Sequence, residues 1–303
     1  MLYTDLLKPA TLKKLCFESG FEPSKSFGQN YLITDRPIKA MIETAHLERT
    51  DTIIEIGPGF GVLTLALAER VQKVISFEIE QTLLEYWQEQ QKEYPNIDIV
   101  WGDVLHHITK KVFELSQDKK QTSKKNSEIV HNTPYKVIAN LPYQITARAI
   151  RTILELDPLP EIIVLMVQKE VATRICAPLG GKHQKGQHDT EVGILSVAVQ
   201  YYGQPRLITH VSKGCFWPSP NVDSAVIAIE HLRSRPGAEA FFRVVRAGFA
   251  HKRKILASNL AGTLNIPSET VRQIIRDITG NEKIRAEQLT VDQWEKIVHQ
   301  LIQ

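Results

Sequence analysis

The sequence predicts an α/β protein with a doubly wound, mostly parallel sheet and a small all-helical domain at its C-terminal end. Short apolar runs alternate with helix-like segments from residue 51 onward, as in repeated strand–helix units. A glycine-rich turn follows the first of these runs. After residue 237 the apolar spacing has only the helical period. We therefore expect two domains, at residues 1–232 and 233–303.

The individual elements follow one another in a regular order. Strands are predicted at 52–56, 73–77, 97–101, 135–139 and 161–167, and helices at 62–71, 81–93 and 146–156. The run at 161–167 is apolar at nearly every position, which is typical of a central strand buried on both faces. Before the first strand, helices are expected at 9–19 and 37–47. The segment between them, 25–32, is too polar and too interrupted by glycine to enter a core.

Two polar stretches interrupt this pattern. Residues 116–133 are rich in lysine, serine, asparagine and glutamine, and residues 178–190 contain several glycines together with His183 and His188. Such compositions are typical of surface loops, and the first is expected to be mobile. Histidines scattered in a polar loop are more often exposed to solvent than bound to a metal. No metal site is therefore predicted.

Composition and charge bound the class of protein. Hydrophobic residues make up 43% of the chain and charged residues 23%, as in globular proteins. No apolar run approaches the roughly 20 residues of a membrane helix, and no secretory signal is visible. We expect a cytoplasmic monomer without a membrane partner. A net charge of +3 does not by itself indicate nucleic-acid binding, but basic residues concentrate at 110–125 and 233–254, where a phosphate backbone would find counter-charge.

Three predicted strands end in residues suited to a nucleoside. Gly57 opens the turn EIGPGFG, in which glycine lets the backbone turn tightly close to a ligand. Glu78 follows the second strand, where a carboxylate can accept hydrogen bonds from ribose hydroxyls, and Asp103 follows the third, where it can accept from an adenine amine. Dinucleotide sites favour a different glycine spacing, and Asp103 could simply cap a helix. Together the three residues favour a nucleoside cofactor.

The segment Asn140, Leu141, Pro142 and Tyr143 follows the fourth strand and so lies at the same sheet edge. An exocyclic adenine amine is a poor nucleophile. The Asn140 side chain and the Leu141 carbonyl can accept its two hydrogens and aim the nitrogen lone pair at a methyl donor. Pro142 keeps the backbone extended, and Tyr143 offers a flat face for a flipped-out base. An ordinary turn is the alternative.

The chain resembles the ribosomal RNA adenine dimethyltransferases, most closely those acting on 16S rRNA. The resemblance rests on FGQNYL at 27–32, EIGPG at 55–59, NLPYQIT at 140–146, QKEV at 168–171, FWPSPNVDS at 216–224 and RAE at 285–287. It implies a Rossmann-like class I methyltransferase fold, S-adenosylmethionine as the cofactor, and N6-dimethylation of two adjacent adenines near the 3′ end of 16S rRNA during small-subunit biogenesis. Tyr31 and Asn221 depart from the residues usual in the family, phenylalanine and lysine.

The resemblance also implies roles for particular residues. Cofactor contacts are carried over to Asn30, Leu32, Gly57, Glu78, Asp103 and Asn140. Phe216 is expected to cover the second face of the target adenine, opposite Tyr143, although by itself it would be interpreted as a loop anchor. The basic stretch 251–254 is expected to grip rRNA. Competing functions are a macrolide-resistance methyltransferase acting on 23S rRNA, a non-catalytic ribosome-assembly or transcription factor, and a nicotinamide oxidoreductase.

Overall fold

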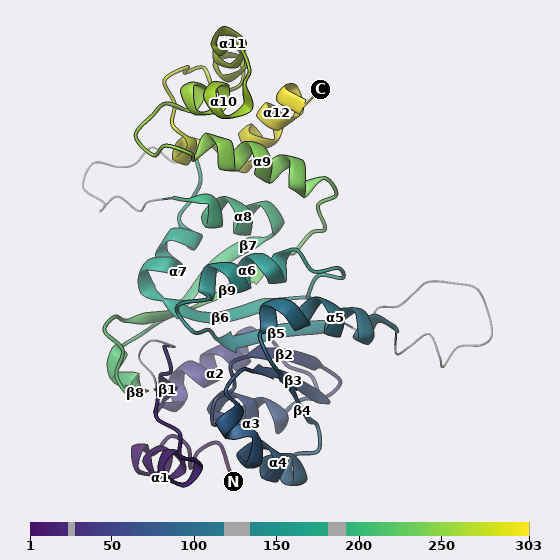
Figure 1. The fold of residues 1–303 in the computed structure, drawn as a ribbon, viewed down its shortest axis with the longest axis vertical. Helices are drawn as coiled ribbons and strands as arrows, with labels where there is room; N and C mark the ends of the chain where they lie inside the picture. Colours follow the sequence, from purple (N-terminus) through teal and green to yellow (C-terminus); the bar gives the residue numbers. More distant parts are fainter. Residues whose placement is uncertain (24–27, 118–133, 181–191, 303) are drawn as a thin grey trace, which may run out of the picture. The chain divides into compact units, whose positions relative to one another are not determined.

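The computed structural model describes residues 1–23, 28–117, 134–180 and 192–302 (Figure 1). The chain divides into two compact units, Met1–Ala172 with Gln204–Leu232, and Thr173–Gly203 with Arg233–Gln303. The last segment of the second unit begins at residue 233, which is also the first residue of the predicted C-terminal domain. The structure differs in placing Thr173–Gly203 with the C-terminal helices, because α8 (Ile194–Tyr202) packs against α9 (Ala238–Gly248) and α12 (Val291–Ile302). Most of both polar stretches, with His183 and His188, lies outside the described residues.

The first unit contains a seven-stranded sheet of order β4-β3-β2-β5-β6-β9-β7. Neighbours from β4 to β6 are parallel, whereas β9 pairs antiparallel with both β6 and β7. The bounds are β2 Thr52–Ile56, β3 Lys73–Glu78, β4 Ile97–Trp101, β5 Tyr135–Asn140, β6 Ile163–Gln168, β7 Gln204–Val211 and β9 Ser224–Glu230. The order reverses between β2 and β5, since β3 and β4 lie on one side and β6 on the other. This is the doubly wound, mostly parallel sheet that the sequence predicts.

The five predicted strands are confirmed, but β7 and β9 have no counterpart among the predictions. All five residues of β2 are buried, as are five of the six in β6, so both strands give the continuous apolar signal of a sheet covered on two faces. β7 is an edge strand with four exposed residues among its eight, and it lacks such a run.

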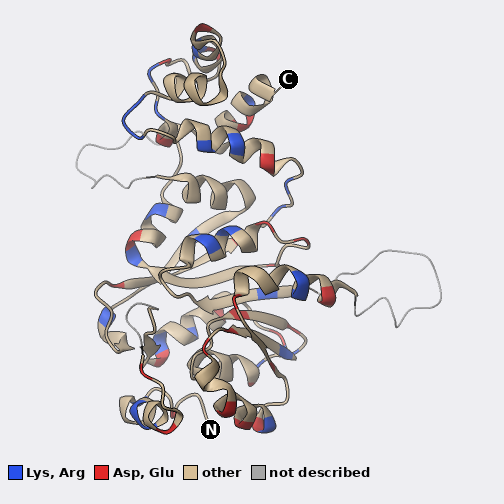
Figure 2. Cartoon of the chain, in the orientation of Figure 1, with Lys and Arg blue, Asp and Glu red and all other residues tan. Residues whose placement is uncertain are grey.

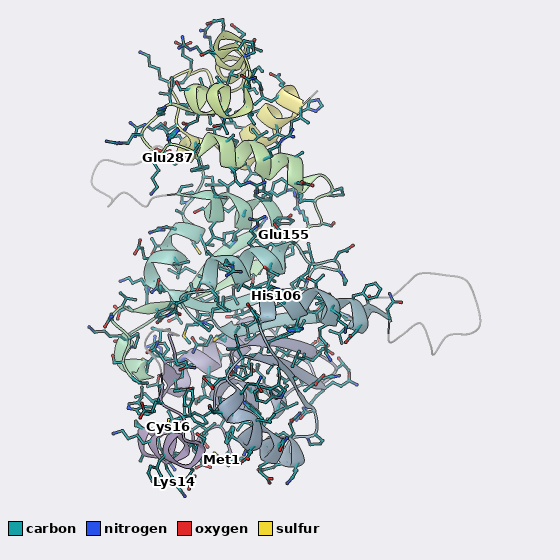
Figure 3. All side chains as sticks on the ribbon, in the orientation of Figure 1. Met1, Lys14, Cys16, His106, Glu155 and Glu287 are labelled. Atoms are coloured by element: carbon teal, nitrogen blue, oxygen red, sulfur yellow. The ribbon has the colours of Figure 1, made fainter. Side chains whose placement is uncertain are left out.

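Three helices of the first unit pack on this sheet. α2 contacts β6, β7, β9 and α3, while α3 contacts β3, α4 contacts β4, and α5 contacts α6. Their bounds are α1 Pro9–Ser19, α2 Asp35–Thr44, α3 Val62–Ala68, α4 Leu84–Glu93 after the 3₁₀ turn η1 Gln81–Leu83, α5 Val104–Gln117 and α6 Thr146–Leu154. On α1, Cys16 packs into the core and Lys14 faces solvent, as labelled in Figure 3. α3 ends before the predicted residue 71, because Arg70 closes a tighter turn on Leu67.

A second, two-stranded sheet corrects one prediction. β1 (Tyr31–Leu32) pairs antiparallel with β8 (Phe216–Trp217), which follows the 3₁₀ turn η3 (Lys213–Cys215). Tyr31 and Leu32 are 8% and 2% exposed and belong to the main core cluster. The expectation that 25–32 stays out of the core is therefore wrong for its last two residues. Their pairing partners lie far along the chain, so local composition does not reveal the burial.

The second unit is helical in its described part. α7 (Lys169–Cys176) begins in the first unit and ends in this one, and the remaining bounds are α8 Ile194–Tyr202, α9 Ala238–Gly248, α10 Leu256–Leu264, α11 Ser268–Thr279, η4 Ala286–Gln288 and α12 Val291–Ile302. Aromatic rings join α8 to α9, where Tyr201 stacks on Phe241 at a centroid distance of 3.9 Å. None of the helices in the described ranges combines the length and apolar character that a membrane crossing requires.

Candidate active site

A cavity of about 250 Å³ lies in the first unit at the carboxyl ends of β2, β3, β4 and β5. The sheet order reverses between β2 and β5, and at such a point the following loops turn away from each other and leave a crevice. Every residue that the sequence analysis proposed for the site lines this one cavity: Asn30, Leu32, Gly57, Glu78, Asp103, Asn140, Leu141, Pro142, Tyr143 and Phe216.

The glycine turn is shaped by aromatic rings as much as by space for a ligand. Gly59 has φ +55°, and a Cβ at this position would lie 2.5 Å from a ring carbon of Tyr31. Gly61 has φ +87°, and a Cβ there would lie 2.8 Å from the indole of Trp87. Both positions therefore require glycine for conformation and for packing. The turn lies between β2 and α3 at the edge of the cavity.

Glu78 is held by backbone amides. Its Oε2 accepts the Gly59 N–H at 3.0 Å, and its Oε1 accepts the N–H groups of Ile79 and Glu80, both at 2.8 Å. Burial raises the pKa of this carboxyl, and the three N–H donors partly oppose the rise. Three of about four lone-pair positions are occupied, so Oε2 keeps one for an incoming donor. The carboxylate is fixed in place before any ligand arrives.

Asp103 serves as a helix cap and also lines the cavity. Its Oδ1 accepts the Leu105 N–H at 2.9 Å, in the first turn of α5. Its Oδ2 lies 3.8 Å from Nε2 of His106, which is labelled in Figure 3. The capping alternative considered from the sequence is thus observed, and it does not exclude ligand contact, because only Oδ1 is engaged by the backbone.

The Asn140 side chain is oriented by the N-terminal segment. Its Nδ2 donates to the Asn30 carbonyl at 3.4 Å, and the Asn30 side chain donates to the Gly28 carbonyl at 3.0 Å. With its nitrogen directed at Asn30, the Asn140 amide keeps Oδ1 as an acceptor. The Leu141 N–H donates to Met166 on β6 at 3.1 Å, which anchors the start of the loop. The Leu141 carbonyl accepts no hydrogen bond from the described residues.

Tyr143 and Phe216 line the same cavity from different elements. The Tyr143 hydroxyl lies 2.8 Å from Oγ of Ser224 on β9, and burial raises the pKa of the phenol. Phe216 is only 3% exposed and pairs with Leu32 across the small sheet. The anchoring interpretation of Phe216 is therefore supported by its packing. Its position in the lining is also compatible with contact to a ligand.

Sequence reasoning did not single out two further lining residues. Glu55, the first residue of the glycine motif, is 1% exposed and accepts a 2.6 Å hydrogen bond from Ser76. Burial raises its pKa to about 7. Gln144, which follows Tyr143 directly, packs against Gly28. Both lie inside motifs visible in the sequence, but their contacts are made by residues distant along the chain.

The charge of the cavity is one-sided. Among the described lining residues the carboxyl groups of Glu55, Glu78, Glu80 and Asp103 are the formally chargeable acids, and the lining contains no lysine, arginine or histidine. A cation and hydrogen-bond donors are favoured by such a lining. A pyrophosphate would meet no counter-charge. In the described ranges no cluster of three or more histidine, cysteine and acidic side chains has the arrangement of a metal site.

Comparison with known proteins identifies the family. The family described as ribosomal RNA adenine dimethylase matches residues 20–303. A protein of Lactiplantibacillus plantarum named ribosomal RNA small subunit methyltransferase A is 38% identical over 298 residues, covering 96% of this chain and 94% of its own. A protein of the same name from Dehalococcoides mccartyi is 37% identical, covering 90% and 86%.

Two solved structures share the fold. A dimethyladenosine transferase from Plasmodium falciparum aligns with a TM-score of 0.67 at 21% identity, over 88% of this chain and 95% of its own. The 23S rRNA methyltransferase ErmE aligns with a TM-score of 0.61 at 25% identity, over 90% and 100%. These likenesses confirm the class I methyltransferase fold with a helical C-terminal part. The match over residues 20–303 and the identity to relatives across most of the chain show that this protein belongs to the ribosomal RNA adenine dimethylase family.

Proposed function

We propose that this chain transfers methyl groups from S-adenosylmethionine to the N6 amines of two adjacent adenines near the 3′ end of 16S rRNA, giving dimethyladenines during small-subunit biogenesis. The acidic, acceptor-rich cavity beside an oriented Asn140 amide carries the proposal. Acidic side chains suit a sulfonium cofactor that also bears an ammonium group. The four acidic side chains in the described lining disfavour the pyrophosphate of a nicotinamide cofactor, because pyrophosphate is an anion.

The cofactor would be held by residues from four strand ends and the N-terminal segment. The free acceptor position on Glu78 Oε2 suits a ribose hydroxyl, and Asp103 Oδ2 suits an adenine amine. The backbone at Gly57 leaves room for the ligand, and Leu32 supplies an apolar wall. Asn30 and Asn140 complete the set. When bound, S-adenosylmethionine supplies the electrophilic methyl group.

Asn140 and Leu141 would activate the target amine. Asn140 Oδ1 and the Leu141 carbonyl are two acceptors on one short loop, so they can hold both amine hydrogens and direct the nitrogen lone pair. Tyr143 would stack on the flipped-out adenine, and Phe216 would border its other face. Because a proton can leave to water after transfer, the scheme requires no strong base. Among the described lining residues, the titratable side chains are the carboxyl groups of aspartate and glutamate and the phenols of Tyr31 and Tyr143.

The second unit would bind rRNA. His251, Lys252, Arg253 and Lys254 form an exposed turn between α9 and α10, and Figure 2 shows basic residues gathered on this turn and along α9. Lysine and arginine at such a turn suit phosphate contacts, which release counterions and bind independently of base sequence. We place the activity in the cytoplasm and assign it to a monomer. Size-exclusion chromatography with light scattering tests the monomer.

The decisive experiment supplies labelled S-adenosylmethionine with undermethylated 30S particles in one reaction and 50S particles in another, followed by mapping of the modified bases. We expect two dimethyladenines in 16S rRNA. Label confined to 23S rRNA would instead favour the activity named for ErmE, whose fold this chain shares. Absence of label from both would favour a non-catalytic role in assembly.

Asn140→Ala separates activation of the amine from binding. Loss of the amide removes one of two acceptors, so we expect single-turnover methyl transfer to fall by about 100-fold or more. Affinity for S-adenosylhomocysteine, measured by calorimetry, should fall much less, because Glu78 and Asp103 remain. Full activity of this variant would contradict the account of amine activation.

A further inference from the structure

Gln144 lies directly on the backbone of the N-terminal segment. A Cβ at Gly28 would lie 2.5 Å from Gln144 Oε1 and 3.0 Å from Nε2, so the Gln144 amide occupies the space where any other residue has its side chain. Gly28 has φ +63°, in the left-handed region. Both residues line the cavity, and they come from segments far apart in the sequence. The contact joins the catalytic loop to the segment that carries Asn30 and Leu32.

This contact closes a ring of interactions around one end of the cavity. From Gly28 the ring continues through its carbonyl to the Asn30 side chain at 3.0 Å, and from the Asn30 carbonyl to Asn140 Nδ2 at 3.4 Å. It returns to Gln144 along the loop itself. The bond to Asn140 is long compared with the usual distance of about 2.9 Å, so by itself it restrains the Asn140 amide weakly. Asn30 is thus bound at two points, because its side chain donates to the Gly28 carbonyl and its carbonyl accepts from Asn140.

We propose that Gln144 is a positioning residue that holds Gly28, and through it the Asn30 carbonyl, against the Asn140 amide. Asn140 then keeps Oδ1 turned into the cavity for the target amine. The inference rests on the proposed function, because the amine acceptor is part of that function. It adds that the N-terminal segment, which carries the cofactor residues Asn30 and Leu32, also orients the catalytic amide.

Four variants test this contact. Gln144→Ala removes the side chain that covers Gly28, and Gly28→Ala inserts a methyl group into the same space. The double variant combines both changes. Gly20→Ala is the matched control, since Gly20 has nearly the same φ, +64°, with nothing within 4 Å of its added Cβ. It therefore reproduces the backbone strain without the contact.

We expect Gln144→Ala to lower the single-turnover methylation rate at saturating substrates by about tenfold, because small misplacements of reacting groups slow transfer strongly. Its thermal midpoint should stay near that of the wild type, since the residue lies at the surface of a cavity and not in the core. Gly28→Ala should weaken S-adenosylhomocysteine binding and slow transfer, whereas Gly20→Ala should leave both unchanged. In the Gln144→Ala background, the loss of S-adenosylhomocysteine affinity and of transfer rate caused by Gly28→Ala should be at least about threefold smaller than in the wild type, because the clashing amide is gone.

Two results would overturn the proposal. One is a wild-type transfer rate in Gln144→Ala. The other is a double variant in which the losses of transfer rate and of S-adenosylhomocysteine affinity equal the product of the losses in Gln144→Ala and Gly28→Ala, as for two residues that do not interact. The binding arm uses S-adenosylhomocysteine alone, so it tests the Gly28–Gln144 contact even if wild-type protein methylates no rRNA. Loss of the proposed function and loss of this inference are thus distinguishable.

Discussion

Glu55→Gln should change how the stability of the first unit depends on pH. Glu55 lies in β2 opposite Ser76 of β3, is 1% exposed, and accepts the Ser76 hydroxyl at 2.6 Å. Burial, followed by the charge of Glu78, raises its pKa, and the Ser76 hydrogen bond lowers it, leaving a value of about 7 against 4.5 for an ordinary glutamate. The folded protein therefore holds a proton at pH values where the unfolded chain has released it.

The sign and magnitude follow from this difference. Since the folded-state pKa is raised, the stabilising contribution is complete below pH 4.5 and disappears as the pH rises through 7. The shift of 7 minus 4.5 corresponds to about 3 kcal/mol of unfolding free energy. A glutamine stays neutral at every pH. The unfolding free energy of Glu55→Gln minus that of the wild type should thus rise by about 3 kcal/mol between pH 4.5 and pH 8.

Urea denaturation of both proteins at half-unit steps from pH 4.5 to pH 8 measures this difference, and contributions from titrating groups that do not interact with Glu55 cancel in the subtraction. Ser76→Ala is the companion variant. Removing the hydrogen bond that lowers the pKa of Glu55 should raise that pKa further. The pH at which the Glu55 contribution to the unfolding free energy disappears should therefore be higher in Ser76→Ala than in the wild type. A difference between Glu55→Gln and the wild type that stays constant over this range would refute the reasoning.

Two further predictions concern the site and the fold. Tyr143→Phe keeps the ring that would stack on the adenine and should retain methylation within about threefold. Tyr143→Ala should lower kcat/KM for rRNA by about 10- to 100-fold, which is the equivalent of one base–aromatic stack. Equal activity of both variants in steady-state assays would exclude stacking. Lys136→Met breaks a largely buried pair in which Nζ lies 2.8 Å from Asp51, and urea denaturation should show a loss of about 3 kcal/mol. Arg206→Met, which breaks the more exposed pair with Glu230, should cost less than about 1 kcal/mol, and similar losses in both would contradict the burial argument.

Much of the site could be predicted from the sequence because of one property of parallel sheets. The carboxyl ends of parallel strands meet at one edge, so residues that directly follow several strands come together without any knowledge of packing. Gly57, Glu78, Asp103 and Asn140 are such residues, and the structure brings all four to one cavity. β2 and β6 were predictable for a related reason, since they are buried on both faces and their apolar runs are nearly continuous.

The remaining features depend on contacts between segments far apart in the chain. Tyr31 and Leu32 enter the core because they pair with Trp217 and Phe216, and neither short stretch has a strand signal of its own. The assignment of Thr173–Gly203 to the helical unit depends in the same way on packing with later helices.

Local residue patterns are enough to predict the fold class, the sheet edge that carries the site, and the types of side chain presented there. Which acceptor atoms stay available depends on contacts that form only in the folded chain. Asn140 keeps Oδ1 as an acceptor because its nitrogen is bound by the Asn30 carbonyl, and Gly28 supports Asn30 beneath the Gln144 amide. Such orientation arises from distances of a few ångströms between distant segments, and neither residue spacing nor periodicity encodes those distances.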